Sequence, residues 1–326
     1  MKYNFCTLFN SNYLTKGLAM YQSLNEHFTD FCLYIFPFDE KCLEILKKLN
    51  LPKVVVVSLK EFEDPELLKI KTTRTPKEYC WTCSAATTWH TIKTYNLDNI
   101  TYIDADLFFV NSPEPLIQEL TNDSILITEH RYRADHDKTA TSGKYCVQFM
   151  TFKNTEEGLT TLSWWRNACL DWCYDRHEDG KFGDQKYLDD WPTRFTGVHE
   201  LQHLGGGLAT WNMRRFSYQK KNGHLLVTDQ QADRTDPLIF YHFHGVRLYK
   251  IFGKVIATAG NQKLDPLIKE LYRQYARTIL KTHLVIKKIE PEFNLGFNPV
   301  REYFRVNLLG KIVPLKIKKN LKLNKL

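Results

Sequence analysis

The fold class of this chain is decided by the stretch Tyr102-Ile103-Asp104-Ala105-Asp106-Leu107-Phe108-Phe109-Val110. An apolar run ends in two carboxylates that are separated by one small residue, and a second apolar run follows. Ligands bind beyond the carboxyl ends of strands in open α/β sheets, so this stretch places Asp104 and Asp106 at a site. Close carboxylates repel each other unless a cation lies between them, and Mg²⁺ or Mn²⁺ prefers such oxygen ligands. We therefore expect a divalent-metal site here; the alternative is a solvated turn rich in aspartate.

The residues before this stretch alternate between two kinds of pattern. Strand-like apolar runs occur at 2–9, 31–36, 54–58 and 100–104, and helix-like periodicities lie between them at 14–28, 40–49 and 78–95. Ser11 or Asn12 is the expected cap of the first helix. Alternating strands and helices predict right-handed crossovers and a mostly parallel sheet covered by helices on both faces.

The pattern loosens after Asp106. Strands are expected at 124–128, 145–152 and 238–244, and helices at 159–172 and 263–280. The prediction is one α/β domain over 1–283, with a nucleotide-binding half at 1–110 and a mixed acceptor-binding half at 111–283. Residues 284–326 are expected to form a basic C-terminal appendage.

A second chemical feature is the run Phe240-Tyr241-His242-Phe243-His244-Gly245. Residues two apart on a strand point to the same face, so both imidazoles are expected on one side of it. Histidine is a plausible third ligand for Mn²⁺, and Gly245 allows backbone to approach a phosphate closely. Taken alone, two histidines are more often structural groups; paired with the two aspartates, the metal-ligand and structural interpretations carry equal weight.

Taken together, Asp-Ala-Asp after a strand and His242-Phe243-His244-Gly245 far downstream resemble the GT-A glycosyltransferases, and most of all the family-eight group that includes glycogenin. The resemblance implies a nucleotide-sugar donor, UDP-sugar above all, and Mn²⁺ or Mg²⁺ as cofactor. It implies His242 as the third metal ligand, with His244 as the second choice.

The N-terminal run Thr7-Leu8-Phe9-Asn10-Ser11-Asn12-Tyr13-Leu14-Thr15-Lys16-Gly17 is similar to the same family's opening strand and loop. By that likeness Leu8, Asn10, Asn12 and Tyr13 contact uridine and ribose, with Tyr13 stacking on the base. A Tyr13 that simply packs against the first helix is the alternative.

The segment Phe182-Gly183-Asp184-Gln185 resembles the family's Asp-Gln pair. The likeness implies that Asp184 holds hydroxyls of the donor sugar and that Gln185 lies near the reacting anomeric carbon. A helix N-terminus capped by Asp184 is a compatible alternative.

Two positions depart from the family pattern. Cys146 and Gln148 stand where the family has an Asn-x-Gly below the donor sugar, so Gln148 is expected to alter the sugar pocket. Leu248 replaces the lysine that follows the metal histidine, and Arg247 or Lys250 is expected to contact the diphosphate instead.

The resemblance further implies transfer with retention of anomeric configuration to a glycan or lipid-linked acceptor, as in surface polysaccharide biosynthesis. Asp189 and Asp190 keep an inverting enzyme with a carboxylate base open. The rival interpretations are a sugar nucleotidyltransferase, a metal-dependent phosphohydrolase and a sugar-binding protein without transferase activity. A nucleotidyltransferase needs a glycine-rich phosphate loop, and residues 5–17 contain only Gly17.

The formal charge of +8 is concentrated in the tail, because residues 301–326 carry a net charge of +7. A nearly neutral body argues against nucleic acid as a partner. The basic, leucine-bearing tail predicts peripheral contact with an anionic membrane, the alternative being a solvated tail. We expect a cytoplasmic protein, which contact through the tail would place at the inner face of the membrane. Of the eight cysteines, the pairs Cys80/Cys83 and Cys169/Cys173 invite a zinc interpretation, but buried thiols are expected instead.

Overall fold

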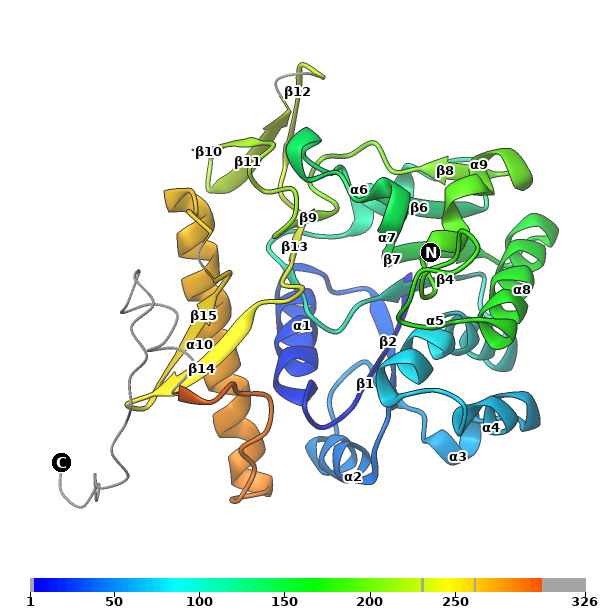
Figure 1. Ribbon diagram of the computed structural model, residues 1–326. Coiled ribbons are helices and arrows are strands. Elements are labelled where there is room, and N and C mark those ends of the chain that lie inside the picture. The colour runs from blue at the N-terminus through cyan, green and yellow to red at the C-terminus, as the bar shows by residue number, and fades with distance from the viewer. Residues whose placement is uncertain (1–2, 230–231, 261, 301–326) are drawn as a thin grey trace.

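One seven-stranded sheet forms the centre of the computed structural model, which describes residues 3–229, 232–260 and 262–300 (Figure 1). In spatial order its strands are β3 (Val54–Val56), β2 (Phe31–Pro37), β1 (Tyr3–Phe9), β4 (Asn99–Ile103), β7 (Tyr145–Lys153), β6 (Ile125–Glu129) and β8 (Val198–Glu200). Neighbours are parallel except at β7, which runs antiparallel to β4 and β6. The mostly parallel sheet predicted from the alternating pattern is thus confirmed.

Helices cover both faces of this sheet. The intervening and flanking helical elements are α1 (Leu14–His27), α2 (Glu40–Leu49), α3 (Leu59–Phe62), α4 (Pro65–Lys71), α5 (Pro76–Thr94), α6 (Glu114–Gln118), η1 (Ala134–His136), α7 (Thr139–Ser142), α8 (Glu156–Asp171), η2 (Lys186–Asp190), α9 (Trp191–Arg194) and α10 (Pro266–Ile289). α1 and α2 share one hydrophobic cluster with Phe5 and Leu33, whereas α5 and α8 share another with Cys6 and Tyr34. Side chains alternate across the sheet, so neighbouring residues of β1 and β2 enter opposite cores.

Local sequence fixes where the helices begin. Thr75 and Glu78 form a reciprocal capping box at the start of α5, and Pro76 occupies its first turn, so the helix begins two residues before the expected position. The N-cap of α1 is Tyr13, which makes no side-chain capping bond, so neither Ser11 nor Asn12 caps this helix.

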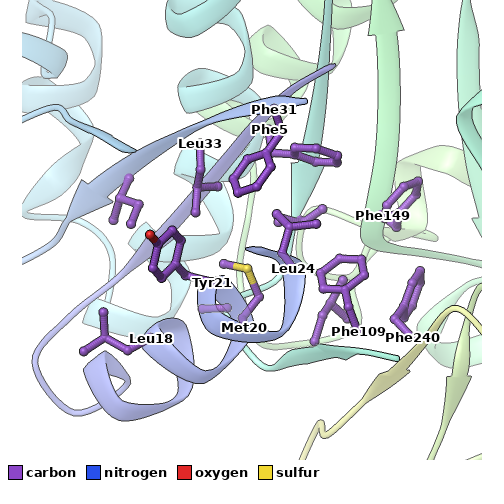
Figure 2. Packing of buried hydrophobic residues seen from close by; sticks show 14 of the residues in the cluster. Phe5, Leu18, Met20, Tyr21, Leu24, Phe31, Leu33, Phe109, Phe149 and Phe240 are labelled. Atoms are coloured by element: carbon purple, nitrogen blue, oxygen red, sulfur yellow. The ribbon is translucent and has the colours of Figure 1, made fainter. Parts of the chain in front are cut away.

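The second half of the chain adds smaller sheets. They comprise β5 (Leu107–Phe109) with β13 (Phe240–His242) and β9 (Leu208–Ala209), then β10 (Ser217–Lys221) with β11 (His224–Asp229) and β12 (Arg234–Pro237), and finally β14 (Arg247–Ile251) with β15 (Lys254–Thr258). Figure 2 shows Phe240 of β13 beside Phe109 and Phe149, with ring centroids 5.7 Å and 5.4 Å away respectively. These contacts hold the small β5–β13–β9 sheet against the central sheet.

Helix α10 is longer than expected and crosses the predicted boundary at 283. It packs against α1 and β15, as the orange helix beside the blue one in Figure 1 illustrates. Beyond it Phe293 is fully buried, and the backbone N–H of Asn298 donates to the carbonyl of Leu248 at 2.7 Å. Residues 284–300 therefore pack with the main body, while the basic stretch 301–326 lies outside the described residues and its membrane contact stays a prediction.

The cysteines agree with buried thiols. All eight are free and all but Cys80 are buried. Within the described ranges, metal-ligating side chains converge in one group only, and it contains no cysteine. Among the helices that the structure describes, none has the length and apolar character that crossing a bilayer requires.

Candidate functional site

Asp104 and Asp106 lie in the tight turn that joins β4 to β5. The backbone N–H of Asp104 donates to the carbonyl of Gln148 on β7 at 3.0 Å, and the N–H of Leu107 donates back to the carbonyl of Asp104 at 3.2 Å. The Tyr102 hydroxyl donates to Asp104 Oδ1 at 3.1 Å. These bonds set both carboxylates at the carboxyl end of β4, where the sequence predicts them.

His242 reaches the same point from far along the chain. β13 pairs antiparallel with β5, placing His242 opposite Leu107, and the N–H of Phe243 donates to the carbonyl of Asp106 at 2.9 Å. His242 Nε2 lies 3.0 Å from Asp106 Oδ1 and 3.5 Å from Asp104 Oδ2. One ligand atom from each of the three side chains lies within 4.8 Å of the others.

The charges of this group are strongly coupled. Burial raises the pKa of Asp104, and the neighbouring Asp106 acts in the same direction. Burial would also raise the pKa of Asp106, but His242 and Lys16 outweigh it and hold that pKa well below its ordinary value. Burial opposes protonation of His242, yet the charge and hydrogen bond of Asp106 raise its pKa. Two carboxylates and one imidazole converging in a buried place form a donor set that suits Mn²⁺ or Mg²⁺.

Lys16 is a site residue that the sequence analysis did not single out. Its side chain is buried in the first turns of α1, with Nζ 3.8 Å from Asp106 Oδ2 and 4.0 Å from the centre of the Tyr13 ring. Burial lowers the pKa of Lys16, although Asp106 opposes this effect. A lysine between the apolar positions Leu14 and Leu18 of α1 was the available signal, since a lysine that becomes buried there needs a partner.

The other residues expected to bind the nucleotide line the loop before α1. Leu8 is buried in the core at the end of β1, so its side chain packs instead of facing solvent. Asn10 Oδ1 accepts from the N–H of Asn12 at 3.1 Å, which shapes the loop. Tyr13 is 42% exposed and stands beside Lys16, so one face of its ring remains available to a base.

Asp184 lies near the metal group, but it does not cap a helix. The element that follows it is the 3₁₀ helix η2, and Gln185 occupies its N-cap position. Burial raises the pKa of Asp184 to about 7, and the charge of Asp104 adds to the shift. Gln185 donates from Nε2 to the carbonyl of Ser142 at 2.5 Å, which ties it to α7.

His244 stays near His242 without joining the group that includes Asp104 and Asp106. It is exposed, and its ring lies 5.5 Å from the His242 ring and 5.7 Å from Trp211, measured between ring centroids. Gly245 has a positive φ of 67° and an open surrounding, and Arg247 is exposed at the start of β14. Lys250 Nζ instead lies 2.9 Å from His283 Nε2, so its side chain is engaged away from the metal group.

Gln148 departs from what the sequence suggested. Its side chain is fully buried, with Oε1 2.7 Å from His242 Nδ1, and does not project freely into a sugar pocket. Cys146, two residues earlier on β7, is also buried. The polar group at this position contacts a metal-ligand candidate from behind.

No family model matches the chain. It is 32% identical over 304 residues to the uncharacterised protein YfnD of Bacillus subtilis strain 168, a match that spans 91% of this chain and 95% of YfnD. It is 30% identical over 303 residues to the uncharacterised protein YfnF of the same organism, spanning 90% of this chain and 96% of YfnF. The chain belongs to the family of YfnD and YfnF.

Comparison with solved structures identifies the fold of this chain. The glycosyltransferase GlyE of Streptococcus pneumoniae TIGR4 is similar with a TM-score of 0.50 and 13% identity, over 87% of this chain and 64% of GlyE. The architecture is the GT-A fold, as the sequence predicts.

Proposed function

We propose that the chain is a metal-dependent glycosyltransferase, which transfers a sugar from a nucleoside-diphosphate sugar to a glycan or lipid-linked acceptor. The observation that carries the proposal is the convergence of Asp104, Asp106 and His242 at the carboxyl end of β4. A UDP-sugar is the preferred donor, and surface polysaccharide biosynthesis is the proposed pathway. We propose a cytoplasmic location, with the basic tail touching the inner face of the membrane.

Asp104, Asp106 and His242 would hold the divalent cation. When bound, the cation supplies Lewis-acid stabilisation of the charge that develops on the departing diphosphate. The two carboxylates differ in exposure: Asp106 is 7% exposed and contacts His242 and Lys16, whereas Asp104 is 29% exposed. Asp104 is therefore the side that opens toward a donor.

Lys16 takes the place of the family's missing C-terminal lysine in this proposal. Its ammonium lies between Tyr13 and Asp106, next to where a diphosphate would meet the carboxylates. With Tyr13 stacking on the base, Lys16 would neutralise phosphate oxygens next to Asp106. His244 and Arg247 follow His242 in the sequence and are exposed. They are proposed to contact the diphosphate from farther out than Lys16, with Gly245 leaving room for it.

Retention of configuration is the proposed stereochemistry. The acceptor oxygen bonds to the anomeric carbon on the face from which the diphosphate leaves, and the hydroxyl proton passes to the diphosphate. Asp184 is proposed to hold donor-sugar hydroxyls and Gln185 to lie near the anomeric carbon. The carboxylates that would support inversion are engaged: Asp189 pairs with Lys186 at 2.6 Å and Asp190 with Arg194 at 2.5 Å.

One rival is a sugar-binding protein without transferase activity. The sequence argument for it is the altered strand with Cys146 and Gln148 below the donor sugar. Gln148 is buried against His242 instead, so its side chain gives no reason to expect a blocked pocket.

The test is release of nucleoside diphosphate from a panel of UDP- and GDP-sugars, with Mn²⁺ and with EDTA. Asp106→Asn should reduce turnover by a factor of about 10² or more, because the ligand stabilises charge in the transition state. Asp30→Asn, at an exposed aspartate before β2, is the matched control and should behave like the wild type. Metal-independent turnover, or full activity of Asp106→Asn, would rule the proposal out.

A further inference from the structure

Gln148 touches both sides of the candidate metal centre. Its backbone carbonyl accepts from the N–H of Asp104 at 3.0 Å, and its side-chain Oε1 lies 2.7 Å from Nδ1 of His242. The side chain has no solvent exposure, and its Nε2 has no hydrogen-bond partner in the described part of the chain. A buried amide that leaves its own N–H₂ unsatisfied costs free energy, so the contact that it does make with His242 must compensate.

The surroundings leave the amide little freedom. Gly207 has a positive φ of 98°, and a Cβ at that position would lie 3.3 Å from Gln148 Nε2 and 3.0 Å from Thr128 Cγ2. On its other side the His242 ring packs edge to face against Trp211, with ring centroids 5.3 Å apart. The absence of a side chain at 207 thus makes room for the glutamine, and aromatic packing fixes the plane of the imidazole.

The orientation of this hydrogen bond decides which nitrogen of His242 is free. A carbonyl oxygen accepts, so Nδ1 must carry a hydrogen. Without a cation Nε2 also carries a proton, which it shares with Asp106. Once that proton has left, the lone pair of Nε2 points at Asp104 and Asp106. An amide turned the other way would place the hydrogen on Nε2 and close the site to a cation. Partners of this kind, behind a metal-ligating histidine, orient the ring and raise its basicity.

We propose that Gln148 is a positioning residue of the metal centre, which holds His242 with its proton on Nδ1 so that Nε2 can bind a divalent cation. The inference rests on the proposed function, because it assumes that the Asp104–Asp106–His242 group binds metal. This role of Gln148 departs from the family pattern, because the glycosyltransferase family that the chain resembles has glycine at this position.

The experiment measures Mn²⁺ affinity of the full chain by titration, following free Mn²⁺ by electron paramagnetic resonance. Gln148→Leu, which removes the acceptor, should weaken binding by about 10- to 100-fold. Gln148→Glu keeps an acceptor oxygen at the same place and should bind Mn²⁺ at least as tightly as the wild type. Gln219→Leu, at an exposed glutamine of β10, is the matched control and should leave the affinity unchanged.

A second readout does not depend on affinity. With ¹⁵N-labelled histidine and diamagnetic Mg²⁺, the wild-type His242 should show a protonated Nδ1 and an unprotonated Nε2. The inference is overturned if Nε2 carries the proton in the Mg²⁺ form, or if Gln148→Leu is folded and binds Mn²⁺ as the wild type does. If Gln148→Leu does not fold, two other results decide. The inference stands if Gln148→Glu binds Mn²⁺ at least as tightly as the wild type and the wild-type His242 carries its proton on Nδ1, and it is overturned if either result fails. A wild type that binds no Mn²⁺ sinks the proposed function itself, whereas wild-type binding with an unaltered Gln148→Leu sinks only the role of Gln148.

Discussion

The two aspartates should differ in what they contribute to the metal-free protein, although both are expected to bind the cation. Asp106 is paired with His242 at 3.0 Å and with Lys16 at 3.8 Å, and its side chain is only 7% exposed. Replacing it by asparagine keeps the shape but leaves two buried cationic partners uncompensated. Breaking a buried pair in this way typically costs about 3–5 kcal/mol. We expect Asp106→Asn to lose about 3 kcal/mol of unfolding free energy in EDTA.

Asp104 should behave in the opposite way. Burial and the charge of Asp106 raise its pKa, so the charged form of Asp104 is disfavoured in the folded protein. Asparagine keeps an oxygen that accepts from the Tyr102 hydroxyl, which lies 3.1 Å away. Removing the repulsion should therefore leave Asp104→Asn as stable as the wild type, or more stable by up to about 1 kcal/mol.

Urea unfolding followed by circular dichroism measures both effects. In EDTA the order of stability should be Asp104→Asn at or above wild type, with Asp106→Asn well below. Free Mn²⁺ at a hundred times its dissociation constant should add about 2.7 kcal/mol to the wild type and almost nothing to either variant. Equal losses for the two variants in EDTA would refute the charge assignment, and a full Mn²⁺ gain in either would refute its role as a ligand.

Three further predictions follow from individual contacts. Gly207→Ala should cost about 1–3 kcal/mol in urea unfolding, because φ is 98° there, and should weaken Mn²⁺ binding by displacing Gln148. Phe240→Ala should cost about 3–5 kcal/mol, because the ring stacks on Phe149, and calorimetry should show the loss with and without Mn²⁺. His283 is fully buried, and burial lowers its pKa to about 4. Its unfolded form protonates near pH 6.5, so this contribution to stability is present above that pH and declines as pH falls toward 4. The free energy of unfolding of the wild type should fall by up to about 2 kcal/mol between pH 7 and pH 5 through His283. Urea titrations at both pH values should show that His283→Gln lacks this loss.

The sequence predicted six strands of the central sheet, but not the short, half-buried edge strand β8. The longer strands were visible because they are nearly continuous apolar runs. Every residue of β1 and β2 is buried, and a strand covered on both faces leaves a pattern that is visible without a structure. The β5–β13–β9 sheet left no such pattern. β9 is two residues long, and its partner β13 lies more than thirty positions later, so only the folded pairing defines it.

The candidate site divides in the same way. Asp104 and Asp106 were found because a local pattern, a strand that ends in two carboxylates, carries their chemistry. Lys16 was not singled out, and Gln148 was expected in the sugar pocket and not behind His242, because their contacts are with partners 90 and 94 positions away respectively. The cap of α1 was misassigned because Ser11 and Asn12 are ordinary capping residues, whereas here the Ser11 N–H is bonded to Asp39 Oδ2 at 2.7 Å and shapes the loop.

The pairing of β5 with β13 brings the ligand residues together before any cation binds, although they come from distant segments of the chain. His242 and Asp106 are separated by 136 positions, and bringing them together costs chain entropy that a cation alone would have to offset. Here that entropy is offset by contacts that do not involve the ligand atoms. They are the β5–β13 pairing, the hydrogen bond from the Phe243 N–H to the Asp106 carbonyl, and the stacking of Phe240 on Phe149. Asp106 and His242 would then bind a cation in place of the proton that they share. The affinity of the cation is therefore set by the competition for His242 Nε2, which Gln148 biases from behind.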